Sequence, residues 1–276
     1  MGGPPVKLGA IVMSENRFVQ VSQSAGIARV LINRPDALNA LNAAVLQQLA
    51  EVFDQLGRMK FSDLRVVVLE GAGEKAFVAG ADIKLMQVAT RLELREFIAL
   101  GQSVMRQIER LPVPVIAAVD GFAIGGGLEL ALACDLTIAT ARSKMGQAEV
   151  NLGLIPGFGG TQRLLSRVGV GTAKRLIFTG ENISAEEAVR LGVVDYCVSV
   201  EEFEVKVNQL AETMASKSSF ALAAAKRAID NATVEARLAG LTREVEEFIG
   251  LFEFDDTKEG LAAFIEKRKP QFKGER

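Results

Sequence analysis

Short β-branched runs alternate with stretches of helical period along the first half of the chain. Three of these runs are typical of strands, and the second and third end in turn residues. They cover residues 18–22, 27–33 and 64–70. Between the last two, apolar residues recur at the spacing of one helix face and predict a helix over about 43–56. Asn42 stands at its N-cap position, and we expect Gly57 to end it.

The alternation continues beyond residue 90. Apolar spacing predicts a long helix over 91–111, which prolines at positions 112 and 114 end. A strand at 115–119, a helix from Gly127 and a strand at 136–139 follow. This order favours an α/β fold in which crossover helices connect parallel strands.

The pattern becomes helical in the last third of the chain. Ser184 opens a capping box for a short helix that we expect Gly192 to end, and 193–198 is the last strand-like run. Residues 201–269 then have almost wholly helical spacing, with interruptions expected near 216–219, 231–232 and 255–256. We therefore divide the chain into a flexible N-terminus (1–16), a catalytic core (17–200) and a C-terminal helical section for oligomerisation (201–276).

Four phenylalanines make this helical section strongly apolar. They are Phe248, Phe252, Phe254 and Phe264. Each such side chain buries about 150–250 Å², so together they represent several hundred Å² of aromatic surface. Such a section can pack on its own core, on another subunit or on both. A contiguous patch of that size in water invites aggregation, so we expect a neighbouring subunit to cover it.

Composition excludes several classes of function. The 276 residues include no histidine, which removes Ser-His and Cys-His nucleophile pairs and His-ligated metal sites, so we expect no metal. The net charge of −2 argues against nucleic acid as a partner. No apolar run reaches the ~18 residues of a membrane span, so we expect no membrane association.

The two cysteines, Cys134 and Cys197, indicate a reducing compartment. They lie far apart in apolar runs and form neither a CxxC motif nor a disulfide framework. Residues 1–16 lack the Arg-rich amphipathic pattern of a transit peptide. We therefore expect a cytoplasmic protein.

Two loops of small residues suit a developing negative charge. Gly125, Gly126 and Gly127 lead into a helix, where free N–H groups and the helix dipole favour an anion. The second loop, 79–84, follows an apolar run at 76–78. Glycines also occur in plain turns, but two such loops can each aim one N–H at a single oxygen, which is the minimal oxyanion hole. Neither loop has the spacing of a dinucleotide fingerprint or a P-loop.

Glu129 and Glu149 are the candidate catalytic groups. Most glutamates are solvated, but Glu129 interrupts an otherwise apolar helix, so we expect its side chain to point inward or into a cleft. A semi-buried carboxyl has a raised pKa, which suits proton transfer near neutral pH. Two carboxyls that face one pocket titrate separately, one as acid and the other as base.

Three further features have structural interpretations beside functional ones. Asp135 lies between a helix and a strand, and we expect its carboxylate to satisfy backbone donors. The loop 154–161 can be a plain turn that leads into a helix over 162–168, but its closeness to Glu149 favours a place in the same pocket. The basic run 267–269 is typical of a solvated helix end, where cations suit the dipole.

Together these motifs resemble the enoyl-CoA hydratase/isomerase (crotonase) superfamily, in order from about residue 17 to 272. The motifs are Asn33-Arg34-Pro35 with Asn39-Ala40-Leu41, Ala79-Gly80-Ala81-Asp82-Ile83, Gly125-Gly126-Gly127 with Glu129 and Cys134-Asp135, and Gly146-Gln147 with Glu149 and the loop from Leu154 to Thr161. The resemblance implies a core of repeated ββα units with two roughly perpendicular sheets. It also implies a C-terminal helical section that trimerises, commonly into a hexamer of two trimers.

The resemblance also implies roles for individual residues. The N–H groups of Ala81 and Gly126 match an oxyanion hole for a thioester oxygen, and Glu129 and Glu149 match two catalytic glutamates. The residues that match the coenzyme A channel and substrate site are Ala37, Leu38, Ala79, Ala81, Asp82, Ile83, Lys84, Gly126, Pro156, Gly157, Phe264 and Lys267. Asp36 departs from the family pattern, because many relatives carry a basic residue there, so a phosphate contact from this position is not expected.

The resemblance predicts an enoyl-CoA hydratase of fatty acid β-oxidation. Such a lyase adds water to a trans-2-enoyl-CoA thioester and gives 3-hydroxyacyl-CoA, with no cofactor beyond the coenzyme A of the substrate. We assign Glu129 to water activation and Glu149 to protonation of the α-carbon. The presence of both favours a hydratase over a 3,2- or dienoyl-CoA isomerase. The sequence also leaves open a CoA decarboxylase or hydrolase on the same fold, and a non-catalytic or RNA-binding relative.

Overall fold

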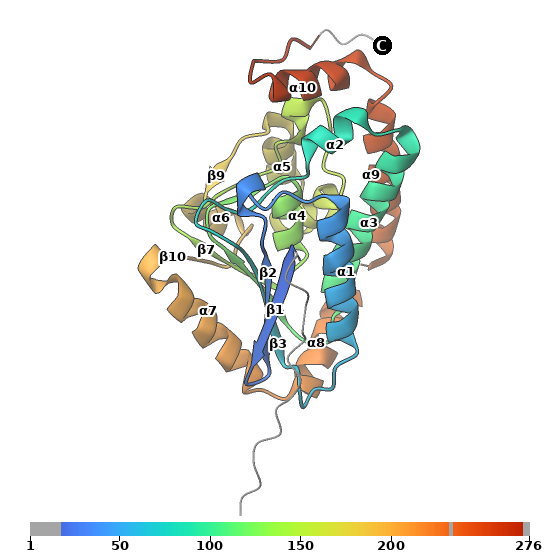
Figure 1. The fold of residues 1–276 in the computed structure, drawn as a ribbon. Coiled ribbons are helices and arrows are strands. Elements are labelled where there is room, and N and C mark those ends of the chain that lie inside the picture. The colour runs from blue at the N-terminus through green and yellow to red at the C-terminus, as the bar shows by residue number, and fades with distance from the viewer. Residues whose placement is uncertain (1–17, 232–233, 273–276) are drawn as a thin grey trace, which may run out of the picture.

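The strands of the chain form two sheets (Figure 1). The computed structural model describes residues 18–231 and 234–272. The larger sheet contains, in spatial order, β1 (Val19–Ser24), β2 (Ile27–Ile32), β3 (Val66–Gly71), β5 (Val115–Val119), β7 (Leu136–Thr140) and β10 (Tyr196–Val198). The smaller sheet contains β4 (Ala76–Ala79), β6 (Phe122–Ile124), β8 (Lys144–Gly146) and β9 (Ile183–Ser184). Strands β1 and β2 pair antiparallel, as do β8 and β9, and the other neighbouring strands are parallel.

Three ββα units build most of both sheets. Their helices are α2 (Ile83–Val88) with α3 (Arg91–Arg110), α4 (Gly126–Leu132), and α5 (Gly160–Thr179), which follows a short 3₁₀ turn, η2 (Glu149–Leu152). These helices come after β3–β4, β5–β6 and β7–β8, respectively. The first strand of each unit joins the larger sheet and the second joins the smaller sheet. This topology confirms the predicted α/β fold with a repeated ββα core.

The other helices cover this core. They are α1 (Ala43–Gly57), which follows the 3₁₀ turn η1 (Pro35–Ala37), then α6 (Ala185–Leu191), α7 (Val200–Ala215), α8 (Ser219–Asn231), α9 (Val234–Leu251) and α10 (Asp255–Ile265). Helix α7 lies on one face of the larger sheet, where Val207 and Ala211 pack against β3, β5 and β7. Figure 1 shows α1, α3 and α9 on the other side of that sheet. Within the described residues, no helix has both the length and the apolar character of a membrane span.

Local signals set several helix ends as predicted. The side chain of Asn42 caps α1 by accepting a backbone N–H at 2.8 Å. Thr90 and Glu93 form a reciprocal capping box at the start of α3, which ends just before the two prolines. Ser184 and Gly192 bound α6 as expected.

The last strand is shorter than the sequence predicts. The strand expected over 193–198 is limited to the three residues of β10. The backbone N–H groups of Val193 and Val194 donate instead to the carbonyl of Ala188, at 2.8 and 3.3 Å. These bonds close the turn after α6, so the two valines are not free to join the sheet.

Two helices differ in detail from expectation. The interruption expected near 255–256 is confirmed at residues 252–254, between α9 and α10, and the acidic pair itself opens α10, because carboxylates suit a helix N-terminus. Helix α5 extends beyond the expected 162–168, with a kink at Gly169 where φ is 74°. The interruption expected at 231–232 lies partly outside the described residues, and the N-terminal segment 1–16 lies wholly outside them.

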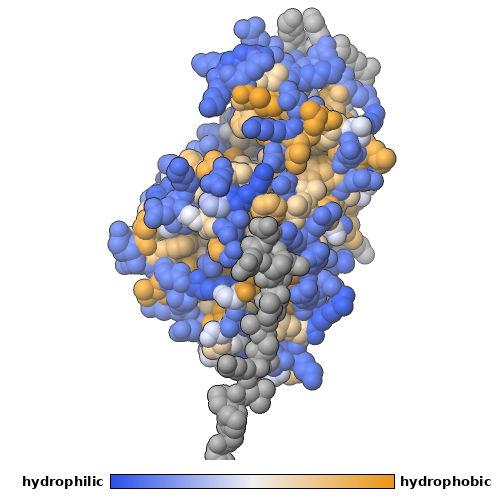
Figure 2. Space-filling view, in the orientation of Figure 1, coloured by the Kyte–Doolittle hydropathy of each residue, from blue (hydrophilic) through white to orange (hydrophobic). Residues whose placement is uncertain are grey.

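The four phenylalanines of the helical section do not form one exposed patch, so that prediction is wrong. Phe248 is 3% exposed and belongs to the main core, and Phe252 is half-buried against the same core. Phe254 is also half-buried, whereas Phe264 is 57% exposed. The chain therefore covers much of this aromatic surface itself. Apolar surface remains in the upper half of Figure 2, below α10.

Candidate active site

A cavity of about 350 Å³ lies at the carboxyl ends of β4, β6 and β8 and reaches residues of α9 and α10. Its lining combines both small-residue loops, both candidate glutamates and an apolar wall. We define the apolar wall as Met86, Ile98, Leu154, Phe158, Phe248 and Phe264. A pocket with mostly apolar sides and a few convergent polar groups is the usual form of a small-molecule site.

The loop after β4 directs one N–H toward this cavity. The N–H of Leu41 donates to the carbonyl of Gly80 at 2.8 Å, and the N–H of Asp82 donates to the carbonyl of Leu41 at 2.9 Å. In such a parallel bridge the intervening residue, Ala81, points its own N–H away from Leu41. Ala81 lines the cavity, which makes this N–H a candidate donor to a ligand.

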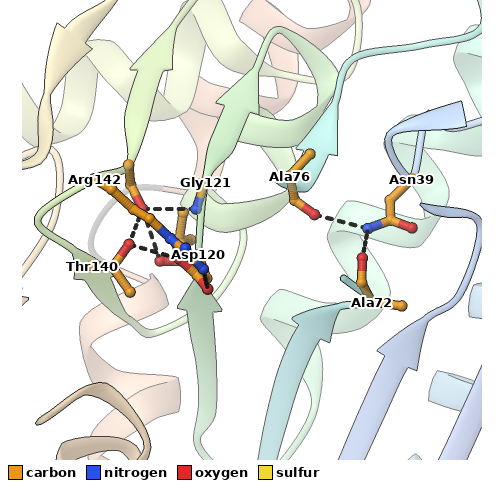
Figure 3. Close-up of polar contacts among 9 residues, drawn as sticks. Asn39, Ala72, Ala76, Asp120, Gly121, Thr140 and Arg142 are labelled. Atoms are coloured by element: carbon orange, nitrogen blue, oxygen red, sulfur yellow. Dashed lines mark hydrogen bonds and ion pairs between the residues drawn. The ribbon is translucent and has the colours of Figure 1, made fainter. Parts of the chain in front are cut away.

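Asn39 anchors the start of β4 and the chain just before it (Figure 3). Its side chain is fully buried and donates to the carbonyls of Ala72 and Ala76, at 2.9 and 2.8 Å. Its side-chain oxygen accepts the N–H of Arg34 at 2.9 Å. Arg34 in turn forms an ion pair with Asp82 at 2.9 Å. The motif residues around 33–41 therefore connect both ends of β4 to the turn before α1.

A second polar cluster ties neighbouring ββα units together (Figure 3). Asp120, at the turn between β5 and β6, accepts from Thr140 at 2.8 Å and from Arg142 at 2.7 Å. The N–H of Gly121 donates to Ser143 at 3.1 Å. These bonds fix the start of β6, the strand that leads to the glycine loop.

The glycines at 125 and 127 are required by close contacts. A Cβ on Gly125, whose φ is 52°, would lie 2.8 Å from a carboxylate oxygen of Glu149. A Cβ on Gly127 would lie 1.9 Å from the carbonyl oxygen of Val78, so its absence lets α4 pack directly on β4. Gly126 between them begins α4 and lines the cavity. The N–H of a first helical residue has no partner within its helix, so this donor is also available to a ligand.

Glu129 is buried and held by backbone donors. Its side chain is 1% exposed, and its Oε1 accepts the N–H groups of Phe158 and Gly160, at 2.8 and 2.6 Å. Burial raises the pKa of Glu129 well above its usual range, and the charges of Glu149 and Glu244 raise it further. The two N–H groups oppose this shift because they stabilise the ionised carboxylate.

Glu149 lies at the start of η2, in the same cavity. In the amide orientation that satisfies both side chains, the buried Gln147 donates to both carboxylate oxygens of Glu149 at 3.1 Å. Burial raises the pKa of Glu149 to about 8, and the charge of Glu244 contributes to the rise. A carboxyl with this pKa is largely protonated at neutral pH, so the site can hold one carboxylate and one carboxylic acid. Neither glutamate is a solvated surface group.

Three buried residues near the loop 157–161 were missed by sequence reasoning. Glu244 is 3% exposed and accepts the N–H of Gly159 at 2.5 Å and that of Thr161 at 3.0 Å. Arg163 and Gln102 are also buried and donate to the carbonyls of this loop. A signal for Glu244 was present, because it falls between the apolar residues at 241 and 248 on the inward face of its helix.

The structure gathers some of the predicted site residues and not others. Those lining the cavity with Glu129 and Glu149 are Ala79, Ala81, Ile83, Gly126, Gly157 and Phe264. Those outside its lining are Ala37, Leu38, Asp82, Lys84, Pro156 and Lys267. The loop 154–161 contributes Leu154, Gly157 and Phe158 to the cavity, which confirms the interpretation of that loop.

Asp135 has the structural role expected from the sequence. Its carboxylate accepts the N–H of Val115 at 2.7 Å and forms an ion pair with Lys226 at 2.7 Å. It therefore connects the start of β5 to the start of β7 and to α8.

Comparison of the sequence with known proteins gives one consistent result. Residues 22–275 match the model of the family described as enoyl-CoA hydratase/isomerase. The chain is 45% identical to a short-chain-enoyl-CoA hydratase of Clostridium acetobutylicum, over 91% of this chain and 95% of that protein. It is 44% identical to a crotonyl-CoA hydratase of Syntrophomonas wolfei, over 89% and 94% of the two chains.

Comparison of the fold agrees. The crystal structure of an enoyl-CoA hydratase from Mycobacterium avium subsp. paratuberculosis superposes with a TM-score of 0.84 at 32% identity, covering 93% of this chain and 98% of that one. An enoyl-CoA hydratase from Bacillus anthracis gives a TM-score of 0.76 at 41% identity, covering 94% and 100%.

Proposed function

The chain belongs to the enoyl-CoA hydratase/isomerase family, and we propose that it is an enoyl-CoA hydratase. It adds water across the double bond of a trans-2-enoyl-CoA thioester and gives 3-hydroxyacyl-CoA. The observation that carries the proposal is the meeting of two carboxyls and two loop N–H groups at one cavity. The names of the matched hydratases support it and do not favour an isomerase, a decarboxylase, a hydrolase or an RNA-binding protein.

The two loop N–H groups serve as the oxyanion hole in this proposal. Addition of water to the β-carbon pushes negative charge onto the thioester oxygen as an enolate forms. The amides of Ala81 and Gly126 bind that oxygen, and each such donor stabilises the transition state by roughly 3–4 kcal/mol. No electron is gained or lost overall, so the reaction calls for no redox cofactor, and coenzyme A enters as part of the substrate.

The two carboxyls divide the proton transfers. We assign Glu129 as the base, because two backbone N–H groups and the start of α5 stabilise its ionised form against the burial and neighbouring charges that raise its pKa. It takes a proton from water as the oxygen attacks the β-carbon. Glu149 is the acid, because its raised pKa keeps it protonated near neutral pH, and it gives its proton to the α-carbon. Proton exchange with solvent then restores both groups.

Residues outside the cavity are assigned to the rest of the substrate. Ala37, Leu38, Asp82, Lys84, Pro156 and Lys267 match the family's substrate-binding segments but do not line the cavity. We propose that they contact the part of coenzyme A that extends beyond it. The apolar wall receives the acyl chain, and the names of the relatives favour a short chain.

Assembly and location are further parts of the proposal. Val88, Leu92 and Phe178 are 79%, 66% and 72% exposed, which is the kind of surface that a second subunit covers. We propose a homo-oligomer, a hexamer made of two trimers, and light scattering that found a stable, fully active monomer would contradict it. The free thiols of Cys134 and Cys197 support a reducing cytoplasm.

A chain-length series of substrates tests the function. Purified protein is mixed with trans-2-enoyl-CoA thioesters of increasing acyl length, and loss of the conjugated thioester is followed together with formation of 3-hydroxyacyl-CoA. We expect the highest kcat/KM for the shortest members. Turnover of 3-enoyl-CoA without hydration of any 2-enoyl-CoA would overturn the proposal in favour of an isomerase.

A further inference from the structure

Four successive backbone N–H groups at the start of α5 are shared between two buried carboxylates. Those of Phe158 and Gly160 donate to Glu129, at 2.8 and 2.6 Å. Those of Gly159 and Thr161 donate to Glu244, at 2.5 and 3.0 Å. Along the turn, the acceptor of these N–H groups therefore alternates between Glu129 and Glu244. Glu244 comes from α9, more than eighty residues away in sequence.

Glu244 lies behind the site rather than in it. It is 3% exposed, but it is not among the residues that line the cavity, whereas Glu129 is. Its second oxygen also accepts the hydroxyl of Thr161, and its first accepts the side-chain amide of Gln102 at 3.3 Å. A buried carboxylate with this many donors is strongly anchored, because charge-assisted hydrogen bonds are about twice as strong as neutral ones.

The carbonyl side of the same turn is held independently. Arg163, which is 2% exposed and forms a two-point ion pair with Glu109, donates to the carbonyl of Phe158 at 2.7 Å. Gln102 donates to the carbonyl of Gly157 at 3.2 Å. With its carbonyls held by Arg163 and Gln102, the turn depends on Glu244 to fix the direction of the N–H groups at 159 and 161. The N–H groups at 158 and 160 then have little freedom but to face Glu129.

We propose that Glu244 is a positioning residue for the hydration reaction, acting through the turn 158–161 to hold Glu129 in its catalytic orientation. With Oε1 of Glu129 occupied by two N–H groups, Oε2 is the oxygen left to face water and substrate. Loss of Glu244 frees the turn, and Glu129 then samples orientations that do not reach the water. This inference rests on the proposed function, because it concerns the same site.

The charge of Glu244 is consistent with this role. It raises the pKa of both Glu129 and Glu149, while Arg163 and Thr161 counter the rise in the pKa of Glu244 itself. An uncharged amide could not fill this place, because its nitrogen would donate where an oxygen now accepts the N–H of Gly159 or of Thr161. The chain keeps a third buried carboxylate beside two others, which is costly unless it does something for the site.

A double-mutant cycle tests the proposal. Glu244→Gln keeps the shape of the side chain but replaces one acceptor with a donor, and we expect it to lower kcat for crotonyl-CoA about 10-fold with KM changed less than about 3-fold. In the Glu129→Gln background the same substitution should lower kcat less than about 2-fold, because residues that act as a unit are not additive. The matched control is Glu246→Gln, on the same helix but exposed, which should leave kcat unchanged in both backgrounds.

The outcomes separate the positioning role of Glu244 from the proposed hydratase function. An equal loss of kcat in both backgrounds, or no loss in either, overturns the positioning role. If Glu244→Gln fails to fold, Thr161→Val carries the same cycle, because it removes a hydroxyl that donates to Glu244 and keeps the backbone N–H. Hydrogen exchange of the 157–161 segment is measured alongside, and we expect it to rise in Glu244→Gln. This readout still applies if the parent protein proves unable to hydrate crotonyl-CoA, in which case the proposed function fails but the support of the turn by Glu244 is still tested.

Discussion

The cavity is bounded by two regions that hold their residues in different ways. On one side are the loop 79–82, the segment 125–129 at the start of α4 and the turn η2 with Glu149, which belong to the ββα units. Backbone hydrogen bonds between neighbouring units fix these loops, and Gly127 permits a contact of α4 with β4 that any side chain would block. On the other side are α9 and α10, which reach the cavity through Phe248 and Phe264.

This difference assigns the chemical step to the first region and the shape of the cavity to the second. Loop N–H groups whose directions are set by adjacent strands are preorganised before a substrate binds, which is the condition for strong stabilisation of a developing charge. Side chains on a packed helix supply volume and apolar contact, and such packing tolerates changes that conserve volume. Changes in the first region should therefore remove turnover or folding, and changes in the apolar side chains of the second should reduce binding. Glu244 of α9 is the exception, because it acts on Glu129 through the turn 158–161.

The largest effect should follow from removing either carboxylate in the first region. Glu129→Gln and Glu149→Gln should each lower kcat for crotonyl-CoA hydration by about 10²-fold or more, because each replaces a proton-transfer group with an amide of similar shape. Steady-state kinetics on variants with unchanged circular dichroism measures this. Near-parental turnover in either variant would show that the two-carboxyl mechanism is wrong.

A smaller effect should follow from replacing one glycine with alanine in each region. Gly127→Ala should destabilise the fold by roughly 1–3 kcal/mol, because the new Cβ would meet the carbonyl oxygen of Val78 at 1.9 Å. Gly250→Ala, in α9, meets nothing within 4 Å and should stabilise by about 0.5–1 kcal/mol through helix propensity.

Denaturant unfolding of the two glycine variants measures whether each substitution raises or lowers the free energy of unfolding. The contrast between the regions would be broken by two variants that shift stability in the same direction. An effect of Gly127→Ala within about 0.5 kcal/mol of zero would also break it, since that is the range of neutral surface changes.

The first region was largely predictable from sequence, and the reason is physical. A glycine run between a strand and a helix, or a glutamate inside an apolar helix, is a local signal that reports a local geometry. Gly125, Gly127 and Glu129 could therefore be placed correctly without knowledge of the tertiary structure. The two glycine loops meet at one cavity because parallel strands bring their carboxyl ends to the same edge of a sheet.

The second region was not predictable in the same way. Whether Phe248 faces its own core or a neighbouring subunit depends on the course of the chain between α7 and α10, which periodicity does not reveal. Glu244 escaped notice for a related reason, since its partners at 159 and 161 are distant in sequence. The short β10 shows the limit even for local signals, because a turn competed successfully for the N–H groups of Val193 and Val194.

A third effect tests the energetic cost of placing Glu149 in the first region. Burial raises its pKa from 4.5 to about 8, so the folded protein binds this proton more tightly than the unfolded chain does. The stability from that proton is fully present below pH 4.5 and is lost as pH rises toward 8. At pH ~9 the Glu149→Gln variant should therefore be more stable than the parent by roughly 1–2 kcal/mol of unfolding free energy, which raises the melting temperature by about 2–8 °C. This difference in melting temperature should shrink toward acidic pH. Calorimetry at several pH values measures the trend, and a difference that instead grows toward acidic pH would contradict it.

The smallest effect should come from Phe264, the most exposed member of the apolar wall. It is 57% exposed and lines the cavity from α10, so we expect its ring to contact substrate without supporting the core. Phe264→Ala should raise KM for crotonyl-CoA about 3- to 5-fold and leave kcat within about 2-fold, because contacts made equally in the ground and transition states affect only binding. Phe220→Ala is the matched control, since that ring is 74% exposed on α8 and lies outside the cavity lining. A fall in kcat as large as the rise in KM would mean that α10 takes part in the chemical step, and the separation of chemistry from shape would then not hold for this side of the cavity.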